Sequence, residues 1–262
     1  MIFQAAITHW RNIAPWPQDA QVEQDLILCR ALVEIFQDPM LSQAIFLRGG
    51  TALHKLFVAT PQRYSEDIDL VQASAGPIGP LLDALRSRLD PILGRPRRKN
   101  GPDNVTLRYR MESEIPPVIS LRLKIEINTR EHFTVFGPLN RPFGVDSPWF
   151  AGRSEVRTYT LDELLATKLR ALYQRRKGRD LFDLRLGLGM PGADPERIVD
   201  AFRQYMHAEG KKVSRGAFEE NLAAKVALPQ FGNDLQPLLA PSVRYDAAQA
   251  AQVVSEKLLA RL

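Results

Sequence analysis

The sequence contains very little cysteine and no long apolar run. Its 262 residues include a single cysteine, Cys29, so an internal disulfide cannot form. Cys29 lies in the apolar run DLILCRALVEIF, which predicts a small buried side chain and not a reactive thiol. No apolar stretch approaches the roughly 18 to 20 residues that span a bilayer, and the N-terminal residues lack the pattern of an export signal. These absences predict a cytoplasmic protein with no membrane partner.

Two familiar kinds of ligand site are also missing from the sequence. The four histidines are scattered, and with one cysteine they leave no spacing for a structural zinc site. Gly49 and Gly50 are not followed by the third glycine of a dinucleotide fingerprint, nor by the Gly-Lys-Ser/Thr of a P-loop. No internal repeat or low-complexity tract is present. With 45% hydrophobic and 25% charged residues, the composition is that of a globular protein with one large domain or two smaller ones.

One segment of the sequence contains a glycine turn. Residues 46–71 read FLRGGTALHKLFVATPQRYSEDIDLV, which predicts a strand, a Gly-Gly-Thr turn, a short helix and a second strand. Gly49 and Gly50 allow a ligand to approach the backbone closely. Thr51 stands where the helix begins, and the unpaired amides of a first helical turn attract anions. The turn favours a phosphate site, with an ordinary capped turn as the alternative.

The second strand carries an acidic pair. Successive side chains on a strand point to opposite faces, so Asp67 and Asp69 share one face and Ile68 lies on the other. Their Cα atoms are roughly 6.6 Å apart. Both carboxylates can therefore hold one Mg²⁺ ion or share two. The sequence predicts a magnesium site close to the phosphate site.

These two blocks of residues resemble a known signature. Gly49-Gly50-Thr51 followed by Ser65-Glu66-Asp67-Ile68-Asp69 resembles the nucleotidyltransferase signature of the DNA polymerase β-like superfamily. More narrowly, RGGTALHKL with RYSEDIDLV is similar to the AbiEii/MenT group of toxin nucleotidyltransferases from toxin–antitoxin and phage-defence systems. The later segment KLRALYQRRKGRDLFDL, residues 168–184, resembles the second signature of that group.

The resemblance implies both a fold and an activity. The fold is α+β, a polymerase β-like nucleotidyltransferase core with a mixed sheet flanked by helices in residues 1–150, and a helical bundle in residues 151–262. The activity is Mg²⁺-dependent transfer of a nucleoside monophosphate from an NTP to an RNA acceptor, expected to be the tRNA 3′ end, which blocks translation. A cognate antitoxin protein is the implied partner. A small-molecule or protein hydroxyl as acceptor, or an inactive module that binds nucleotide or RNA, are the alternatives.

The resemblance also implies roles for individual residues. These are catalysis by Asp67, Asp69, Lys168 and Asp180; nucleotide binding by Gly49, Gly50, Thr51, Ser65 and Lys168; metal binding by Asp67, Asp69 and Glu126; and Asp183 as a candidate second acid. Glu126 falls on the polar face of the alternating run at residues 119–128, where an exposed glutamate on an edge strand is the alternative. Asp180 is expected to orient Lys168, to cap its helix or to activate the acceptor hydroxyl.

Basic residues form two groups along the chain. The formal net charge is +5 and the sequence pI is near 9.4. Arg97, Arg98 and Lys99 form one group, and Arg175, Arg176, Lys177 and Arg179 form the other. Such groups suit a phosphate-rich partner, so both are candidate RNA-binding sites, with ordinary solvated surface as the alternative.

The periodicity of the remaining sequence predicts mainly helices. Helices are expected at residues 21–37, 81–93, 160–172, 180–188, 195–207, 215–225 and 246–261, and strands at 44–48, 67–72, 105–111 and 119–128. Thr160 and Glu163 predict a capping box at the start of one of these helices. Residues 137–153 are rich in Gly and Pro and predict a loop or linker.

Overall fold

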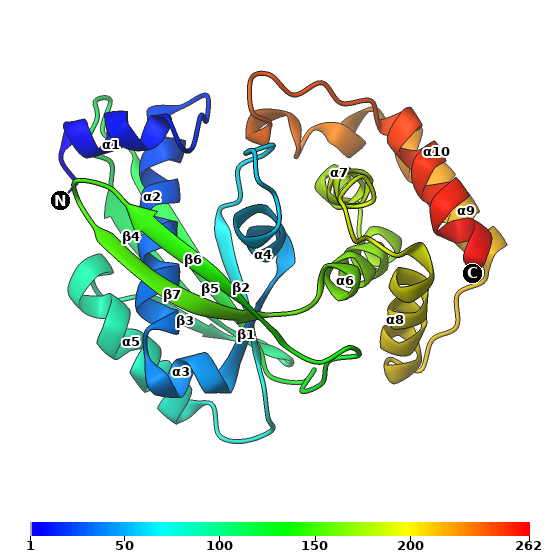
Figure 1. The fold of residues 1–262 in the computed structure, drawn as a ribbon, viewed down its shortest axis with the longest axis horizontal. Helices are drawn as coiled ribbons and strands as arrows, with labels where there is room; N and C mark the ends of the chain where they lie inside the picture. Colours follow the sequence, from blue (N-terminus) through cyan, green and yellow to red (C-terminus); the bar gives the residue numbers. More distant parts are fainter. Residues whose placement is uncertain (1) are drawn as a thin grey trace. The chain divides into compact units, whose positions relative to one another are not determined.

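The computed structural model describes residues 2–262 and divides the chain into two compact units (Figure 1). Unit 1 is the chain up to Phe133 together with Pro138–Tyr159, and unit 2 is Thr134–Gly137 together with Thr160–Leu262. The division after Tyr159, and not after residue 150, follows because residues 151–158 form a strand of the sheet in unit 1. Within residues 2–262, no helix combines the length and the apolar character required to cross a membrane.

Unit 1 is built on a seven-stranded mixed sheet with the order β3-β4-β5-β2-β1-β7-β6. The strands are β1 Ile45–Arg48, β2 Asp67–Gln72, β3 Arg97–Asn100, β4 Asn104–Glu112, β5 Ser120–Asn128, β6 Leu139–Asp146 and β7 Ala151–Thr158. The pairs β2–β5 and β1–β7 are parallel and the others are antiparallel. The predicted α+β class with a mixed sheet is confirmed.

Within residues 2–262, five helices accompany this sheet. They are α1 Gln4–Arg11, α2 Asp19–Phe36, α3 Pro39–Ala44, α4 Gly49–Leu56 and α5 Gly79–Leu93. The long helix α2 packs on the sheet through buried residues such as Leu26, Leu28 and Leu32, with α5 beside it on β4 (Figure 1). Cys29 is buried in α2, as predicted, and burial raises the pKa of its thiol.

The predicted loop at residues 137–153 is wrong, because these residues form most of the β6–β7 hairpin. The sequence misleads here because Pro142 and Gly144 lie inside β6. A proline is tolerated in an edge strand, where no further strand needs its amide, and β6 is the last strand of the sheet. The hairpin joins the sheet through β7, whose Thr158 hydroxyl donates to the Leu47 carbonyl at 2.6 Å.

Unit 2 is helical, as predicted. Its helices are α6 Leu161–Gln174, α7 Gly178–Gly187, α8 Pro195–Ala208, α9 Arg215–Val226 and α10 Ala247–Lys257, with 3₁₀ turns at Pro229–Gly232, Gln236–Leu238 and Leu259–Arg261. Helix α6 packs against α7, α8 and α9. A Cβ on Gly187 would lie 2.3 Å from the Leu165 side chain, so this glycine allows α7 to approach α6 closely.

The start of α6 is capped differently from the prediction. The Thr160 hydroxyl accepts from the Glu163 amide at 3.3 Å, so the N-cap is confirmed. The second half of the capping box is wrong. The buried Glu163 carboxylate instead accepts from the backbone amides of Val135 and Phe136, at 2.8 and 3.1 Å, and from the Tyr205 hydroxyl at 2.7 Å. Glu163 thereby holds residues 134–137 in unit 2.

Candidate functional site

The glycine turn lies directly against the acidic pair. Strand β1 ends at Arg48 and α4 begins at Gly49, whose φ of 77° is left-handed and favours glycine. Strands β1 and β2 are antiparallel, and Arg48 lies opposite Asp69. The glycine turn that follows Arg48 therefore lies next to the Asp69 side chain. A Cβ on Gly49 would lie only 2.3 Å from the Asp69 carboxylate. Any side chain at position 49 would therefore displace this acid.

Gly50 accommodates a different group, the guanidinium of Arg63. A Cβ on Gly50 would lie 2.4 Å from Arg63 Nη2 and 3.2 Å from Ser65 Oγ. Arg63 is buried and donates through Nη1 to the Tyr64 carbonyl at 3.0 Å. The sequence analysis did not single out Arg63. The only available signal was an arginine two positions before Ser65, in a loop whose path the sequence does not define.

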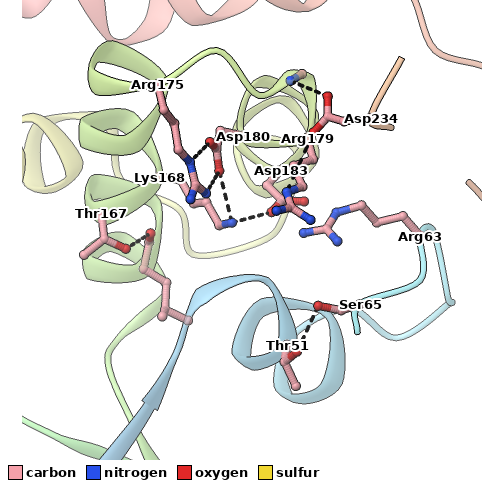
Figure 2. Close-up of polar contacts among 12 residues, drawn as sticks. Thr51, Arg63, Ser65, Thr167, Lys168, Arg175, Arg179, Asp180, Asp183 and Asp234 are labelled. Atoms are coloured by element: carbon pink, nitrogen blue, oxygen red, sulfur yellow. Dashed lines mark hydrogen bonds and ion pairs between the residues drawn. The ribbon is translucent and has the colours of Figure 1, made fainter. Parts of the chain in front are cut away.

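Thr51 ties α4 to the strand that carries the acids. Its side chain is completely buried, and its hydroxyl donates to the Asp67 carbonyl. Ser65 Oγ lies 2.9 Å from the Thr51 hydroxyl and acts as the donor to it, since the single proton of Thr51 is already engaged (Figure 2). The Thr51 hydroxyl is therefore engaged within the protein, and the implied contact of Thr51 with nucleotide stays a prediction. Thr51 and Ser65 fix the backbone at Asp67.

Three carboxylates share one face of the sheet. Asp67 and Asp69 are partly exposed, whereas Ile68 between them is buried on the opposite face. Strand β5 runs parallel to β2 with Lys124 opposite Asp67 and Glu126 opposite Asp69. Glu126 thus lies on the face of the acidic pair, as predicted. The alternative of an edge-strand glutamate is wrong, because β5 lies between β4 and β2.

Lys124 forms a bridge between two of these acids. Its Nζ lies 3.1 Å from Asp67 Oδ2 and 3.2 Å from Glu126 Oε2. Burial lowers the pKa of Lys124, but the charges of Asp67 and Glu126 outweigh it and leave that pKa raised. The pKa of Asp67 is raised as well, mainly by burial and also by the charge of Asp69, against the effect of Lys124.

The donor chemistry of this face fits a divalent cation. Carboxylate oxygens are the ligands that Mg²⁺ prefers, and Mg²⁺ is commonly held by one or two carboxylates together with water and substrate phosphates. Within residues 2–262, no three His, Cys, Asp or Glu side chains converge closely enough to form a complete metal cage. Asp67 and Asp69 therefore fit the type of site in which the nucleotide completes the ligand set. Glu126 lies on the same face, opposite Asp69.

A second charged cluster lies within unit 2. Lys168 on α6 is buried, and its Nζ lies 3.3 Å from Asp180 Oδ1 and 2.9 Å from Asp183 Oδ2, both on α7. Arg175 binds Asp180 with two hydrogen bonds of 2.7 and 2.8 Å (Figure 2). Burial raises the pKa of Asp180, but Lys168 and Arg175 outweigh it and hold that pKa below its usual value. Of the roles considered for Asp180, orienting Lys168 agrees with this contact.

The other basic residues of unit 2 differ in their surroundings. Arg179 lies 3.8 Å from Asp234, whose second oxygen accepts from the Gly178 amide at 2.9 Å. Arg176 and Lys177 are exposed. The predicted group at residues 175–179 is therefore partly neutralised by acids of the same unit.

The class of protein follows from the mixed sheet, from the glycine turn and from Asp67, Asp69 and Glu126 on one sheet face. These features define a protein with a nucleotidyltransferase fold. Solved structures agree. The chain is similar to MenT4, the nucleotidyltransferase toxin Rv2826c from Mycobacterium tuberculosis H37Rv, with a TM-score of 0.69 and 16% identity over 100% of this chain and 91% of that one. It is also similar to JHP933 from Helicobacter pylori, with a TM-score of 0.55 and 19% identity over 92% of this chain and 94% of that one.

The family follows from the sequence. The family model described as nucleotidyl transferase AbiEii toxin, type IV toxin–antitoxin system, matches residues 30–257. The chain belongs to this family, and the resemblance noted in its signature residues is confirmed. No curated protein sequence matches the chain.

Proposed function

We propose that this toxin-family nucleotidyltransferase transfers a nucleoside monophosphate from an NTP to an RNA acceptor, the 3′ end of tRNA, and so blocks translation. The observation that carries the proposal is the contact between the glycine turn and the acids, with Asp69 against Gly49 and with Asp67 and Glu126 on the same face. Membership of the AbiEii family supports nucleotidyl transfer and an antitoxin partner. The basic character of the chain supports a polyanionic acceptor.

In the proposed reaction the acceptor hydroxyl attacks the α-phosphorus of the NTP, the bond to pyrophosphate breaks, and the hydroxyl proton leaves to a base or to water. Asp67 and Asp69, with Glu126 as a further ligand, would hold Mg²⁺, which would supply positive charge to the phosphate oxygens. The backbone amides of Gly49 and Gly50 and the guanidinium of Arg63 hold the phosphates that leave.

Intact acids argue against an inactive binding module, because such a module has no need of metal ligands. The family signature also assigns nucleotide contacts to Ser65 and Lys168, catalysis to Lys168 and Asp180, and the role of a second acid to Asp183. These assignments stay predictions.

The test measures transfer directly. Purified protein incubated with Mg²⁺, each radiolabelled NTP and tRNA is expected to label the RNA 3′ end. Asp69→Ala is expected to lower the rate by roughly two to three orders of magnitude, the usual effect of losing a group that stabilises transition-state charge, and to abolish growth arrest. Glu66→Gln, which changes an exposed neighbouring carboxylate, is the matched control and is expected to retain transfer. Labelling of a protein or of a small hydroxyl compound, with RNA unlabelled, would overturn the RNA acceptor.

A further inference from the structure

The pleat of strands β4 and β5 separates their side chains into an apolar face and a basic face. On β4, Leu107 and Tyr109 are buried on the side where α5 packs, whereas Arg108 and Arg110 are exposed. Strand β5 repeats the pattern with exposed Arg122 between buried leucines. The basic side chains thus occupy the sheet face that carries Asp67, Asp69 and Glu126.

The strand registers arrange these side chains in rows that end at the acids. Arg97 on β3 lies opposite Arg108, Arg108 lies opposite Lys124, and Lys124 lies opposite Asp67. A parallel row runs from Lys99 through Thr106 and Glu126 to Asp69, and Arg110 lies opposite Arg122. Neighbouring strands are about 4.8 Å apart, so a row extends roughly 14 Å from the edge of the sheet to the acidic pair. We call the residues Arg97, Lys99, Arg108, Arg110 and Arg122 the basic face.

This arrangement places like charges opposite each other, which destabilises a sheet. Three cross-strand pairs each consist of two cations, namely Arg97 with Arg108, Arg108 with Lys124, and Arg110 with Arg122. Across the described residues, no carboxylate forms an ion pair with any member of the basic face, although arginines elsewhere, such as Arg86 and Arg88, do have acidic partners. A row of unpaired cations is expected where a polyanion supplies the opposite charge.

We propose that the basic face binds the phosphate backbone of the polynucleotide acceptor and directs its end to Asp67 and Asp69. This inference rests on the proposed RNA acceptor. In the described strands β3, β4 and β5 the one aromatic residue is Tyr109, which is buried on the other side of β4. The bases have no ring to stack on here. Binding is therefore through phosphates, largely independent of sequence and strongly dependent on salt.

The structure also separates residues that are adjacent in the sequence. Arg98 lies between Arg97 and Lys99, but it is opposite buried Leu107 and therefore on the other side of β3. Its Nε donates to Asn100 Oδ1 at 2.8 Å on that side. The sequence predicts equal roles for Arg97, Arg98 and Lys99, whereas the proposal gives Arg98 none. This difference provides a comparison variant from the same strand.

The experiment measures binding of fluorescently labelled, unfractionated tRNA by anisotropy, without NTP, over a range of potassium chloride concentrations. The double variant Arg108→Gln/Arg110→Gln is expected to bind tRNA about tenfold more weakly than wild type. The slope of log affinity against log salt concentration is expected to be smaller in magnitude by about 1.4 to 2. Arg98→Gln is expected to keep the wild-type affinity and slope. Relief of like-charge repulsion should leave the double variant at least as thermally stable as wild type, and thermal unfolding of both proteins checks that weaker binding does not come from unfolding.

Equal binding by wild type and the double variant would overturn the proposed face, and so would an equal loss with Arg98→Gln. The proposed function is judged separately by transfer. Asp69→Ala is expected to lose transfer while retaining tRNA binding. If the enzyme labels tRNA but the double variant binds normally, the basic face is wrong and the RNA acceptor stands. If wild type does not bind tRNA and labels a small hydroxyl compound, both proposals fail.

Discussion

Lys124 controls how much negative charge the acidic site carries. Its ammonium lies within 3.2 Å of both Asp67 and Glu126, and Asn104 donates to the other oxygen of Glu126 at 3.2 Å. One lysine thus offsets part of the charge of three carboxylates. A divalent cation bound by Asp67 competes with this ammonium for the same oxygens.

Replacing the lysine therefore changes metal affinity. Lys124→Met is expected to bind Mn²⁺ about tenfold more tightly than wild type, because a competing charge near 4 Å is worth about 1 kcal/mol at the dielectric constant of water and about 4 kcal/mol at that of a protein surface. Calorimetric titration of the protein alone with Mn²⁺ measures this without any turnover. Arg122→Met is the matched control, since Arg122 lies two positions earlier on the same face, opposite Arg110, and forms no ion pair with a carboxylate of residues 2–262. Unchanged or weaker Mn²⁺ binding in Lys124→Met would contradict competition.

For single residues, the sequence predicted correctly those relations in which the residues lie close together along the chain. The shared face of Asp67 and Asp69 was predicted correctly because the alternation of one strand places both side chains on it. Glu126 was placed correctly on a polar face for the same reason. The contact of Arg63 with Gly50 was missed because it depends on how a loop returns to the turn. The Lys124 bridge requires the pairing of β5 with β2, which no local pattern specifies.

Among the helices, α6 and α7 are joined by a buried charge network. Asp180 and Asp183 are completely buried and are neutralised by Lys168 and Arg175. Removing one partner of a buried pair leaves an uncompensated charge, which is more harmful than removing both. Loss of activity in a Lys168 variant would therefore not by itself demonstrate catalysis, because the two helices also depend on this lysine.

Lys168→Met is accordingly expected to lower the free energy of unfolding by about 3 to 5 kcal/mol at pH 7. The pKa of Asp180 is lowered in the folded wild-type protein, so its stabilising contribution is present above the unfolded pKa and is lost as the pH falls through the folded pKa. In the variant, protonation instead relieves buried carboxylates that have lost their lysine partner, so the difference in unfolding free energy between variant and wild type should narrow on acidification. Urea unfolding at several pH values measures both effects, with Lys177→Met, an exposed lysine, as control. A loss of unfolding free energy in Lys168→Met that stayed constant with pH would argue against the buried charge network.

Helices and strands were predicted best where one periodicity of apolar residues indicates the element. Helix α6 with its Thr160 cap and strand β5 follow from local pattern alone. The β6–β7 hairpin was missed because Pro142 and Gly144 disfavour a strand, and only its place at the edge of the sheet makes them acceptable. Strand β3 could not be predicted for a different reason. Its four residues are exposed and mostly charged, so it has no alternation of apolar and polar residues.

On the scale of the whole molecule, the chain passes from unit 1 to unit 2 and back before entering unit 2 again. Residues 134–137 belong to unit 2, although unit 1 precedes and follows them. Glu163 accepts from two backbone amides of this segment, and the Arg197 guanidinium lies 3.9 Å from the centre of the Phe136 ring. Unit 2 is therefore not complete in a single continuous stretch of sequence.

A fragment of residues 160–262 is accordingly expected to be less stable than unit 2 of the full chain, because the buried Glu163 carboxylate loses two of its donors. In the full chain, Glu163→Gln removes the charge from the same hydrogen bonds and is expected to lower the free energy of unfolding by about 1 to 3 kcal/mol, the cost of impairing a buried polar contact. Glu196→Gln, an exposed acid on α8, is the control and should change it by less than about 0.5 kcal/mol. Urea unfolding followed by circular dichroism compares the three. A fragment of residues 160–262 with the stability of the full chain would show that residues 134–137 contribute nothing to unit 2.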